Sequence, residues 1–172
     1  MSKRSRDLVR PLVSLLAALG VSPTVVTVFG FLVVVASGLF VSQGYFLIGG
    51  LVYLIGGGFD GVDGELARHT NKASPAGALL DSTLDRLSEG LLLFGLLAFF
   101  LRDGNQAGSL LTFSSLISSF LVSYIRARCE GLDLVASRGI MGRPGRVVVL
   151  GFGLIIPGAI IPALLLVTIL SI

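Results

Sequence analysis

Two short segments decide the fold: Asp60-Gly-Val-Asp63-Gly64-Glu-Leu-Ala67-Arg68 and Gly77-Ala-Leu-Leu-Asp81-Ser-Thr-Leu-Asp85. In the first segment, Asp60 and Asp63 are three residues apart, which places both side chains on one face of a helix. In the second, Asp81 and Asp85 are four residues apart and share a face of another helix. The connection between the segments is polar or small and contains Pro75, so we expect the two helices to run antiparallel.

Antiparallel packing of these faces would bring the carboxylates of Asp60, Asp63, Asp81 and Asp85 together among apolar residues. Such charges repel one another and are costly to desolvate unless a cation compensates them. Hard divalent cations prefer oxygen ligands, which favours Mg²⁺, Mn²⁺ or Ca²⁺. The sequence therefore predicts a metal site formed by all four aspartates. A chance cluster of polar or helix-capping residues is the alternative, and intramembrane carboxylates on paired faces are rare without a function.

The composition predicts an integral membrane protein with one domain over residues 1–172. Of the 172 residues 53% are hydrophobic and only 13% are charged, and the mean hydropathy is +0.94. A soluble domain of this length needs more polar surface. Cys129 is the only cysteine, so an intramolecular disulfide is excluded. We expect membrane lipids as the surroundings and no nucleic-acid partner.

The first 20 residues predict an amphipathic helix that lies on the membrane surface. A signal peptide is the alternative, because a basic start precedes apolar residues. Arg10 and Pro11 interrupt that apolar run, and Gly20-Val-Ser22-Pro23 provides a helix stop, a cap and a restart. Residues 23–172 then predict an all-α bundle of six transmembrane helices, at about 23–42, 45–68, 76–101, 108–130, 140–156 and 159–172. One long kinked helix is the alternative for the last two, although Pro157-Gly158 favours a turn.

Charge asymmetry predicts the orientation. Under the six-span layout only Arg102 lies on one side, so the positive-inside rule places both termini and the aspartates at the cytoplasmic face of the cell membrane. The other basic residues share the cytoplasmic side: Lys3, Arg4, Arg6, Arg10, Arg68, Lys72, Arg126, Arg128, Arg138, Arg143 and Arg146.

The spacing Asp-x-x-Asp-Gly-x-x-Ala-Arg, eight residues, then Gly-x-x-x-Asp-x-x-x-Asp resembles the signature of the CDP-alcohol phosphotransferase family. The resemblance implies transfer of a phosphatidyl-type group from a CDP-linked lipid, CDP-diacylglycerol or CDP-archaeol, to an acceptor hydroxyl, with release of CMP. It also implies that Asp85 is the catalytic base and a metal ligand, with Mg²⁺ or Mn²⁺ as the expected cofactor. Nucleotide-binding roles follow for Asp60, Asp63, Gly64, Ala67, Arg68, Gly77 and Asp81.

A second polar cluster follows the fourth predicted span on the side of the carboxylates. Arginines offer paired donors to phosphate, although each could also be a membrane-surface anchor. The run Ser-Tyr-x-x-Ala-Arg-x-Glu-Gly, followed by Arg-Pro-x-Arg, resembles the branch that makes phosphatidylinositol phosphate or its archaeal counterpart. The resemblance implies inositol phosphate as the acceptor, with glycerol 3-phosphate and serine as alternatives. The expected acceptor-binding residues are Ser123, Arg126, Arg128, Arg138, Arg143 and Arg146.

Two further expectations concern class and assembly. A divalent-cation transporter is the rival class, but its site would be expected near mid-membrane and often with an internal repeat, which this sequence lacks. Related enzymes pair through the third and fourth spans, so the resemblance implies a homodimer. Small residues in those spans permit close helix approach: Gly90, Gly95, Gly108, Ser114, Ser115, Ser118 and Ser119.

Overall fold

The structure is a computed structural model that describes residues 3–134 and 141–171, with side chains described from residue 9 onward. Within these ranges all regular structure is helical, which confirms the predicted all-α class. The seven helices are α1 (Lys3–Ala18), α2 (Pro23–Ser42), α3 (Phe46–His69), α4 (Pro75–Arg102), α5 (Gln106–Glu130), α6 (Arg143–Ile155) and α7 (Ile160–Leu170).

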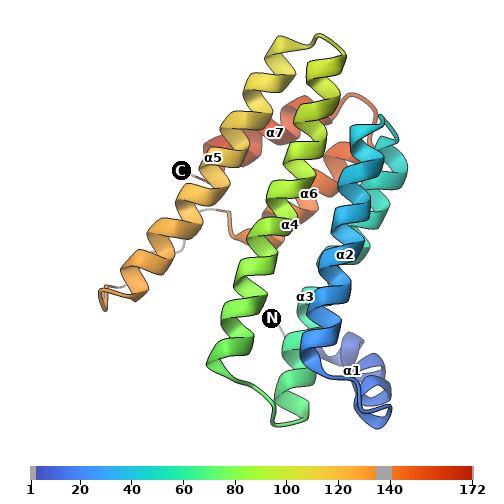
Figure 1. The fold of residues 1–172 in the computed structure, drawn as a ribbon, viewed down its shortest axis with the longest axis vertical. Coiled ribbons are helices and arrows are strands. Elements are labelled where there is room, and N and C mark those ends of the chain that lie inside the picture. Colours follow the sequence, from blue (N-terminus) through green and yellow to red (C-terminus); the bar gives the residue numbers. More distant parts are fainter. Residues whose placement is uncertain (1–2, 135–140, 172) are drawn as a thin grey trace.

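The long helices form one antiparallel bundle (Figure 1). Helix α4 runs between α2 and α5, while α3 packs on α2 and on α6. The two short helices, α6 and α7, contact each other and lie behind α4 and α5 in this view. Helix α1 packs on α3 and lies at the end of the bundle where α3 connects to α4.

The junction between α1 and α2 has the predicted stop and restart. Gly20 has a φ of +70°, a conformation that glycine adopts without the steric cost of a side chain. Ser22 caps α2 by accepting a hydrogen bond from the Val25 amide at 3.3 Å, and Pro23 is the first helical residue. Helix α1 continues through Pro11 instead of ending there.

Helix α1 is anchored to the bundle by a small apolar cluster. Val13 is buried against Val26 of α2 and against Val62 and Leu66 of α3. Val62 and Leu66 flank Asp63 in sequence, so this cluster supports the back of the helix that carries the first aspartate segment.

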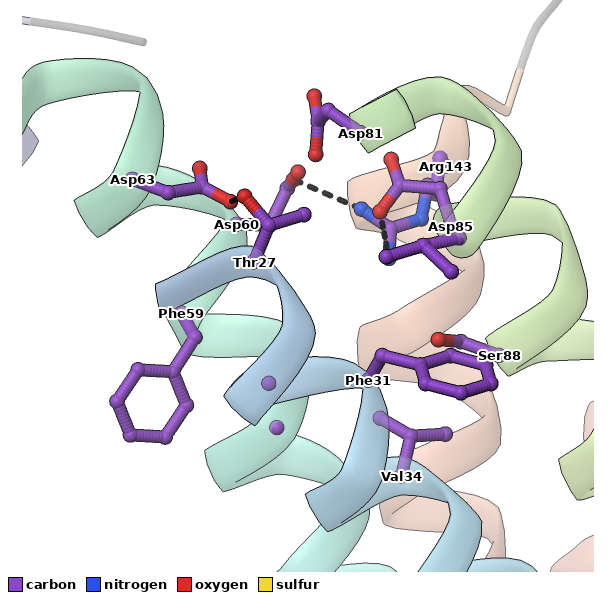
Figure 2. Close-up of a pocket in the computed structure, with 13 residues that line it drawn as sticks. Thr27, Phe31, Val34, Phe59, Asp60, Asp63, Asp81, Asp85, Ser88 and Arg143 are labelled. Carbon is purple, nitrogen blue, oxygen red and sulfur yellow. Dashed lines mark hydrogen bonds and ion pairs between the residues drawn. The ribbon is translucent and has the colours of Figure 1, made fainter. Parts of the chain in front are cut away.

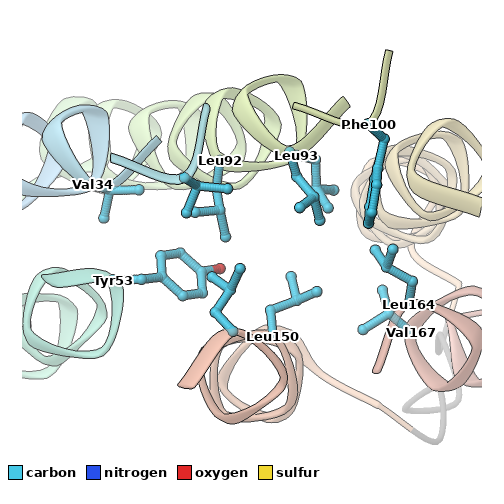
Figure 3. Packing of buried hydrophobic residues seen from close by; sticks show 11 residues of the cluster. Val34, Tyr53, Leu92, Leu93, Phe100, Leu150, Leu164 and Val167 are labelled. Carbon is cyan, nitrogen blue, oxygen red and sulfur yellow. The ribbon is translucent and has the colours of Figure 1, made fainter. Parts of the chain in front are cut away.

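The main core fills the centre of the bundle, where α2, α3, α4, α6 and α7 meet (Figure 3). Tyr53 and Leu150 face Leu92 and Leu93 across this space. Close helix approach holds the bundle together, because in a bilayer van der Waals packing replaces much of the hydrophobic driving force. Helices α2 and α4 approach so closely that a Cβ atom added at Gly95 would collide with the backbone of α2 at Gly38.

The helix boundaries agree closely with the six predicted segments. Helices α6 and α7 are separate, because α6 ends at Ile155 and a turn follows in which Gly158 has a φ of +77°. The alternative of one long kinked helix is therefore wrong. Three helices are long and apolar enough to cross a membrane by length and composition: Pro23–Ser42, Phe46–His69 and Gln106–Glu130.

The small residues expected at a dimer interface make contacts within this chain. Gly95 lies against Gly38, and Gly108 lies against Phe100. Ser115 donates a hydrogen bond to the carbonyl oxygen of Leu164 in α7 at 3.0 Å. Close packing within the chain therefore accounts for Gly95, Gly108 and Ser115, and the homodimer stays a prediction.

Candidate active site

The site lies at the end of the bundle where α3 and α4 are joined. Asp60 and Asp63 come from the last three turns of α3, and Asp81 comes from the second turn of α4, which is capped at Ser74. Carboxylate oxygens of Asp60, Asp63 and Asp81 lie within 4.8 Å of one another (Figure 2). The structure therefore brings three of the four sequence-predicted aspartates into one group.

Asp63 is held by hydrogen bonds to both of its carboxylate oxygens. The Thr27 hydroxyl of α2 donates to Oδ2 at 2.7 Å, and the Gly64 amide donates to Oδ1 at 2.5 Å. Only 4% of the surface of Asp63 is exposed. Thr27 is absent from the sequence-based predictions because nothing local marks it, although it is one of few polar residues in an apolar helix.

The group of three aspartates fits a hard divalent cation. All its members are carboxylates, and Oδ1 of Asp81 is buried without a hydrogen-bond partner among the described residues. A buried carboxylate oxygen without a partner is unfavourable unless a cation contacts it. Mg²⁺ and Mn²⁺ take such oxygen ligands, so Asp60, Asp63 and Asp81 could hold either ion.

Asp85 lies apart from the group of three and forms an ion pair with an arginine of α6. Arg143 bridges two carboxylates, with Nη1 at 2.8 Å from Asp60 and Nη2 at 2.6 Å from Asp85. Figure 2 shows the guanidinium between these two side chains. The sequence predicts Arg143 as an acceptor ligand but gives no sign of this bridge. The role of Asp85 as a metal ligand stays a prediction.

A pocket of about 360 Å³ opens on the α2 side of the aspartates. It is lined by six of the seven residues predicted to bind the nucleotide, all except Asp60: Asp63, Gly64, Ala67, Arg68, Gly77 and Asp81. The Arg68 side chain is 57% exposed and forms an ion pair with Glu65 at 2.8 Å. The pocket also contains polar residues outside the sequence motif, namely Ser22, Thr24, Thr27, Lys72 and Ser74.

A second pocket, of about 180 Å³, opens on the α5 and α6 side. Asp85 lies at its edge, and its lining includes the predicted acceptor residues Ser123, Arg126, Arg143 and Arg146. Arg128 is exposed and is not among the lining residues, and Arg138 lies outside the described residues. The structure adds four lining residues that the sequence-based prediction omits: Ser82, Arg86, Glu89 and Val122.

Arg146 has a partner that the sequence-based prediction missed. Its guanidinium makes two contacts to Glu89 of α4, from Nε to Oε1 at 2.6 Å and from Nη2 to Oε2 at 2.9 Å. A signal was present in the sequence, since Glu89 follows Asp81 and Asp85 at the same four-residue interval and so extends their helix face.

The family model described as CDP-alcohol phosphatidyltransferase matches residues 20–171, which is nearly the whole chain. The chain belongs to this family. It is 39% identical over 138 residues to an archaetidylinositol phosphate synthase of Pyrococcus horikoshii, covering 78% of this chain and 70% of the relative. A chain of this family with three membrane-length helices is a membrane protein.

Solved structures of the Mycobacterium tuberculosis phosphatidylinositol phosphate synthase share the fold. One, with CDP-DAG bound, has a TM-score of 0.83 and 31% identity, covering 94% of this chain and 86% of that chain. Another, in complex with manganese and citrate, also has a TM-score of 0.83 and 31% identity, covering 94% and 82%. The group of three aspartates gives this chain the oxygen ligands that a metal-dependent enzyme of this family needs.

Proposed function

We propose that this enzyme transfers a phosphatidyl-type group from a CDP-linked lipid to the hydroxyl of inositol phosphate and releases CMP. One observation carries the proposal: all four aspartates of the family signature line a small cavity that shares Asp63 and Asp81 with the pocket beside α2 and Asp85 with the second pocket. The two pockets suit two substrates, and the carboxylates lie where those substrates would react. The names of the relatives, which are inositol phosphate lipid synthases, support the same reaction.

The pocket beside α2 is the proposed site of the CDP-lipid. A Cβ atom added at Gly64 would meet only the Arg68 guanidinium, at 3.7 Å, which is an ordinary van der Waals contact. The face of α3 beside Gly64 is therefore uncrowded enough for a nucleotide. Arg68 is exposed at the rim and can turn from Glu65 toward a phosphate, because a guanidinium offers several donors. The donor is CDP-diacylglycerol or CDP-archaeol, and its chains enter from the bilayer.

The reaction needs charge stabilisation at the pyrophosphate and a base at the acceptor hydroxyl. A bound divalent cation, Mg²⁺ or Mn²⁺, supplies positive charge that stabilises the leaving CMP phosphate. Asp60, Asp63 and Asp81 hold it, with Asp85 as a further ligand. Asp85 also accepts the proton of the acceptor hydroxyl, since it lies at the edge of both the carboxylate site and the second pocket. Thr27 orients Asp63 through its hydrogen bond.

The pocket between α4, α5 and α6 is the proposed acceptor site. Arg126 and Arg143 line it with Ser123, and guanidinium groups bind phosphate through charge-assisted hydrogen bonds. Arg128 and Arg138 stay in the proposed set, although Arg128 is exposed and not among the lining residues, and Arg138 lies outside the described residues. Inositol phosphate suits this positive lining better than serine, which is zwitterionic. Glycerol 3-phosphate is the second candidate, because it also carries a phosphate.

The proposal is tested by incubating purified enzyme in detergent or bilayers with CDP-diacylglycerol and each acceptor in turn. Inositol phosphate should give the fastest release of CMP, and glycerol 3-phosphate or serine should give little. A faster reaction with serine would contradict the acceptor assignment but leave the transferase assignment standing. No CMP release with any acceptor, from CDP-diacylglycerol or CDP-archaeol, would contradict both.

We also propose a topology and an assembly. The six helices α2 to α7 cross the cell membrane, α1 lies on its cytoplasmic surface, and the active site and both termini face the cytoplasm. The basic residues around the site support this orientation through the positive-inside rule. Labelling single cysteines from each side, in a Cys129→Ser background, tests it: Ser5→Cys and Ser74→Cys should react only from the cytoplasm. Cross-linking in bilayers tests the proposed homodimer, and a product that stays monomeric would contradict it.

A further inference from the structure

The more deeply buried of the two ion pairs between α4 and α6 lies beside the active site. Glu89 and Arg146 are separated by 57 residues in sequence, and both are almost fully buried, with exposed fractions of 4% and 3%. Both oxygens of the carboxylate are engaged by the one guanidinium. Such a paired arrangement restricts rotation and sliding of one helix against the other, because both donors and both acceptors are fixed.

Arg143 lies one turn before this pair in α6. It is the first residue of the helix, and its cap at Gly142 makes no side-chain hydrogen bond. Its guanidinium is half-buried and bridges Asp60 and Asp85. The position of this guanidinium therefore depends on how α6 is held, and the nearest buried polar contact that holds α6 is Arg146 with Glu89.

We propose that Glu89 is a positioning residue of the enzyme: through Arg146 it fixes α6 so that Arg143 lies between Asp60 and Asp85. Arg146 then belongs to this buried pair and is not a ligand of the acceptor phosphate. Its burial agrees, since a side chain that is 3% exposed and already occupied by a carboxylate has little surface left for a ligand. This inference rests on the proposed function, which assigns Arg143 and Asp85 to the acceptor side of the reaction.

The energetics of buried ion pairs make the two roles of Arg146 separable. Removing one partner leaves the other as an unpaired buried charge, whereas replacing both by apolar residues of similar volume is often neutral. If Arg146 only partners Glu89, the double replacement should therefore recover what each single replacement loses. If Arg146 binds the acceptor, the double replacement cannot recover, because the ligand is still missing.

The experiment compares wild type, Glu89→Leu, Arg146→Met and the double variant. We expect each single change to lower kcat/KM for inositol phosphate by about tenfold or more, and the double variant to return to within about threefold of wild type. The KM for the CDP-lipid should change little throughout. A double variant that is no better than Arg146→Met, or single variants that match wild type, would overturn the proposal.

Two additions keep the test decisive. If the apolar single variants do not fold, Glu89→Gln, Arg146→Gln and their double form a milder set, in which two amides can hydrogen-bond to each other; the same recovery is expected. Arg102→Met, at the opposite end of α4, is the matched control for loss of an arginine and should leave kcat/KM unchanged.

A readout without turnover separates this inference from the proposed reaction. Arg143 pairs with an oxygen of Asp60, so displacement of Arg143 in each single variant should change the dissociation constant of Mn²⁺. The double variant should have the wild-type dissociation constant again. This pattern in an enzyme that releases no CMP would mean that the proposed reaction fails while the positioning role stands. An unchanged Mn²⁺ dissociation constant in both single variants would overturn the positioning role, even in an active enzyme.

Discussion

The carboxylates of the active site have different partners on its two sides. The donor side is the side of the proposed CDP-lipid pocket, and the acceptor side is that of the second pocket. On the donor side, Asp60, Asp63 and Asp81 gather within 4.8 Å, and one oxygen of Asp81 is buried without a partner among the described residues. On the acceptor side, each carboxylate is matched by an arginine of α6: Asp85 by Arg143 and Glu89 by Arg146.

This difference indicates where an outside cation is needed. On the donor side one arginine, Arg143, reaches only Asp60 of the three carboxylates, so this group is suited to a divalent ion. The acceptor side carries built-in cations, which can attract a phosphorylated acceptor and hold Asp85 in place. Four substitutions, taken from the largest expected effect to the smallest, test this division.

Asp81→Asn should have the largest effect, because it removes a ligand from the side that lacks its own cation. Charge stabilisation by a metal is worth several kcal/mol, so turnover should fall by about a thousandfold or more. CMP release and Mn²⁺ binding measure the loss, and Asp60→Asn and Asp63→Asn should behave alike. Asp103→Asn, at the other end of α4, is the control. Normal CMP release by Asp81→Asn in EDTA would contradict the metal site.

Asp85→Asn tests the acceptor side of the same comparison. Loss of a general base typically costs about a hundredfold or more, so kcat should fall by that amount while substrate KM values change little. Mn²⁺ affinity should weaken less than in Asp81→Asn, since Arg143 already compensates Asp85. Steady-state kinetics and metal titration check both points. A loss of Mn²⁺ binding equal to that of Asp81→Asn would make Asp85 chiefly a metal ligand.

Arg126→Ala should act on the acceptor alone. A hydrogen bond to a charged group contributes about 1.5–3 kcal/mol, so the KM for inositol phosphate should rise about tenfold or more. The KM for the CDP-lipid should stay nearly unchanged, because Arg126 lines the second pocket and not the pocket beside α2. Initial rates at varied acceptor concentration measure the effect, with Arg102→Ala as control. Equal increases in both KM values would show that the two pockets are not separate.

Thr27→Val should have the smallest effect of the four. It removes one of the two hydrogen bonds to the Asp63 carboxylate while keeping the size of the side chain. The Gly64 amide still holds the other oxygen, so we expect a loss of only about 1 kcal/mol, or about fivefold in turnover. The metal concentration for half-maximal CMP release should rise correspondingly. Thr112→Val is the control, since Thr112 is a buried threonine whose hydroxyl bonds only the carbonyl of Gly108 in its own helix. No difference between the two variants would remove Thr27 from the site.

The two sides also differ in how far the sequence predicts them. The aspartates of the donor side are close in sequence: Asp60 and Asp63 share one helix, and Asp81 lies in the second turn of the next. A short connection joins the two helices, so helical periodicity is enough to predict that these side chains meet. The helix ends were predictable for the same reason, because glycine, serine and proline mark them, as at Gly20 and Ser22.

The acceptor side depends on contacts between helices distant in sequence. Arg146 meets Glu89 across 57 residues, and Arg143 of the same helix meets Asp85. On the donor side Thr27 was missed for the same reason, since it meets Asp63 across 36 residues. No periodicity within one helix encodes which face of α6 turns toward α4, since that is set by the packing of the whole bundle. A count of basic residues on one side therefore grouped Arg143, Arg146 and Arg128 together, although their surroundings differ.

CMP release from CDP-diacylglycerol, measured with inositol phosphate before and after metal removal, tests the central claim most directly. We predict rapid CMP release with Mg²⁺ or Mn²⁺, loss of CMP release in EDTA, and recovery when the divalent ion is restored in excess. The lipid product should carry the inositol phosphate group. Release that continues unchanged in EDTA, or CMP formed without a lipid product containing inositol phosphate, would contradict it.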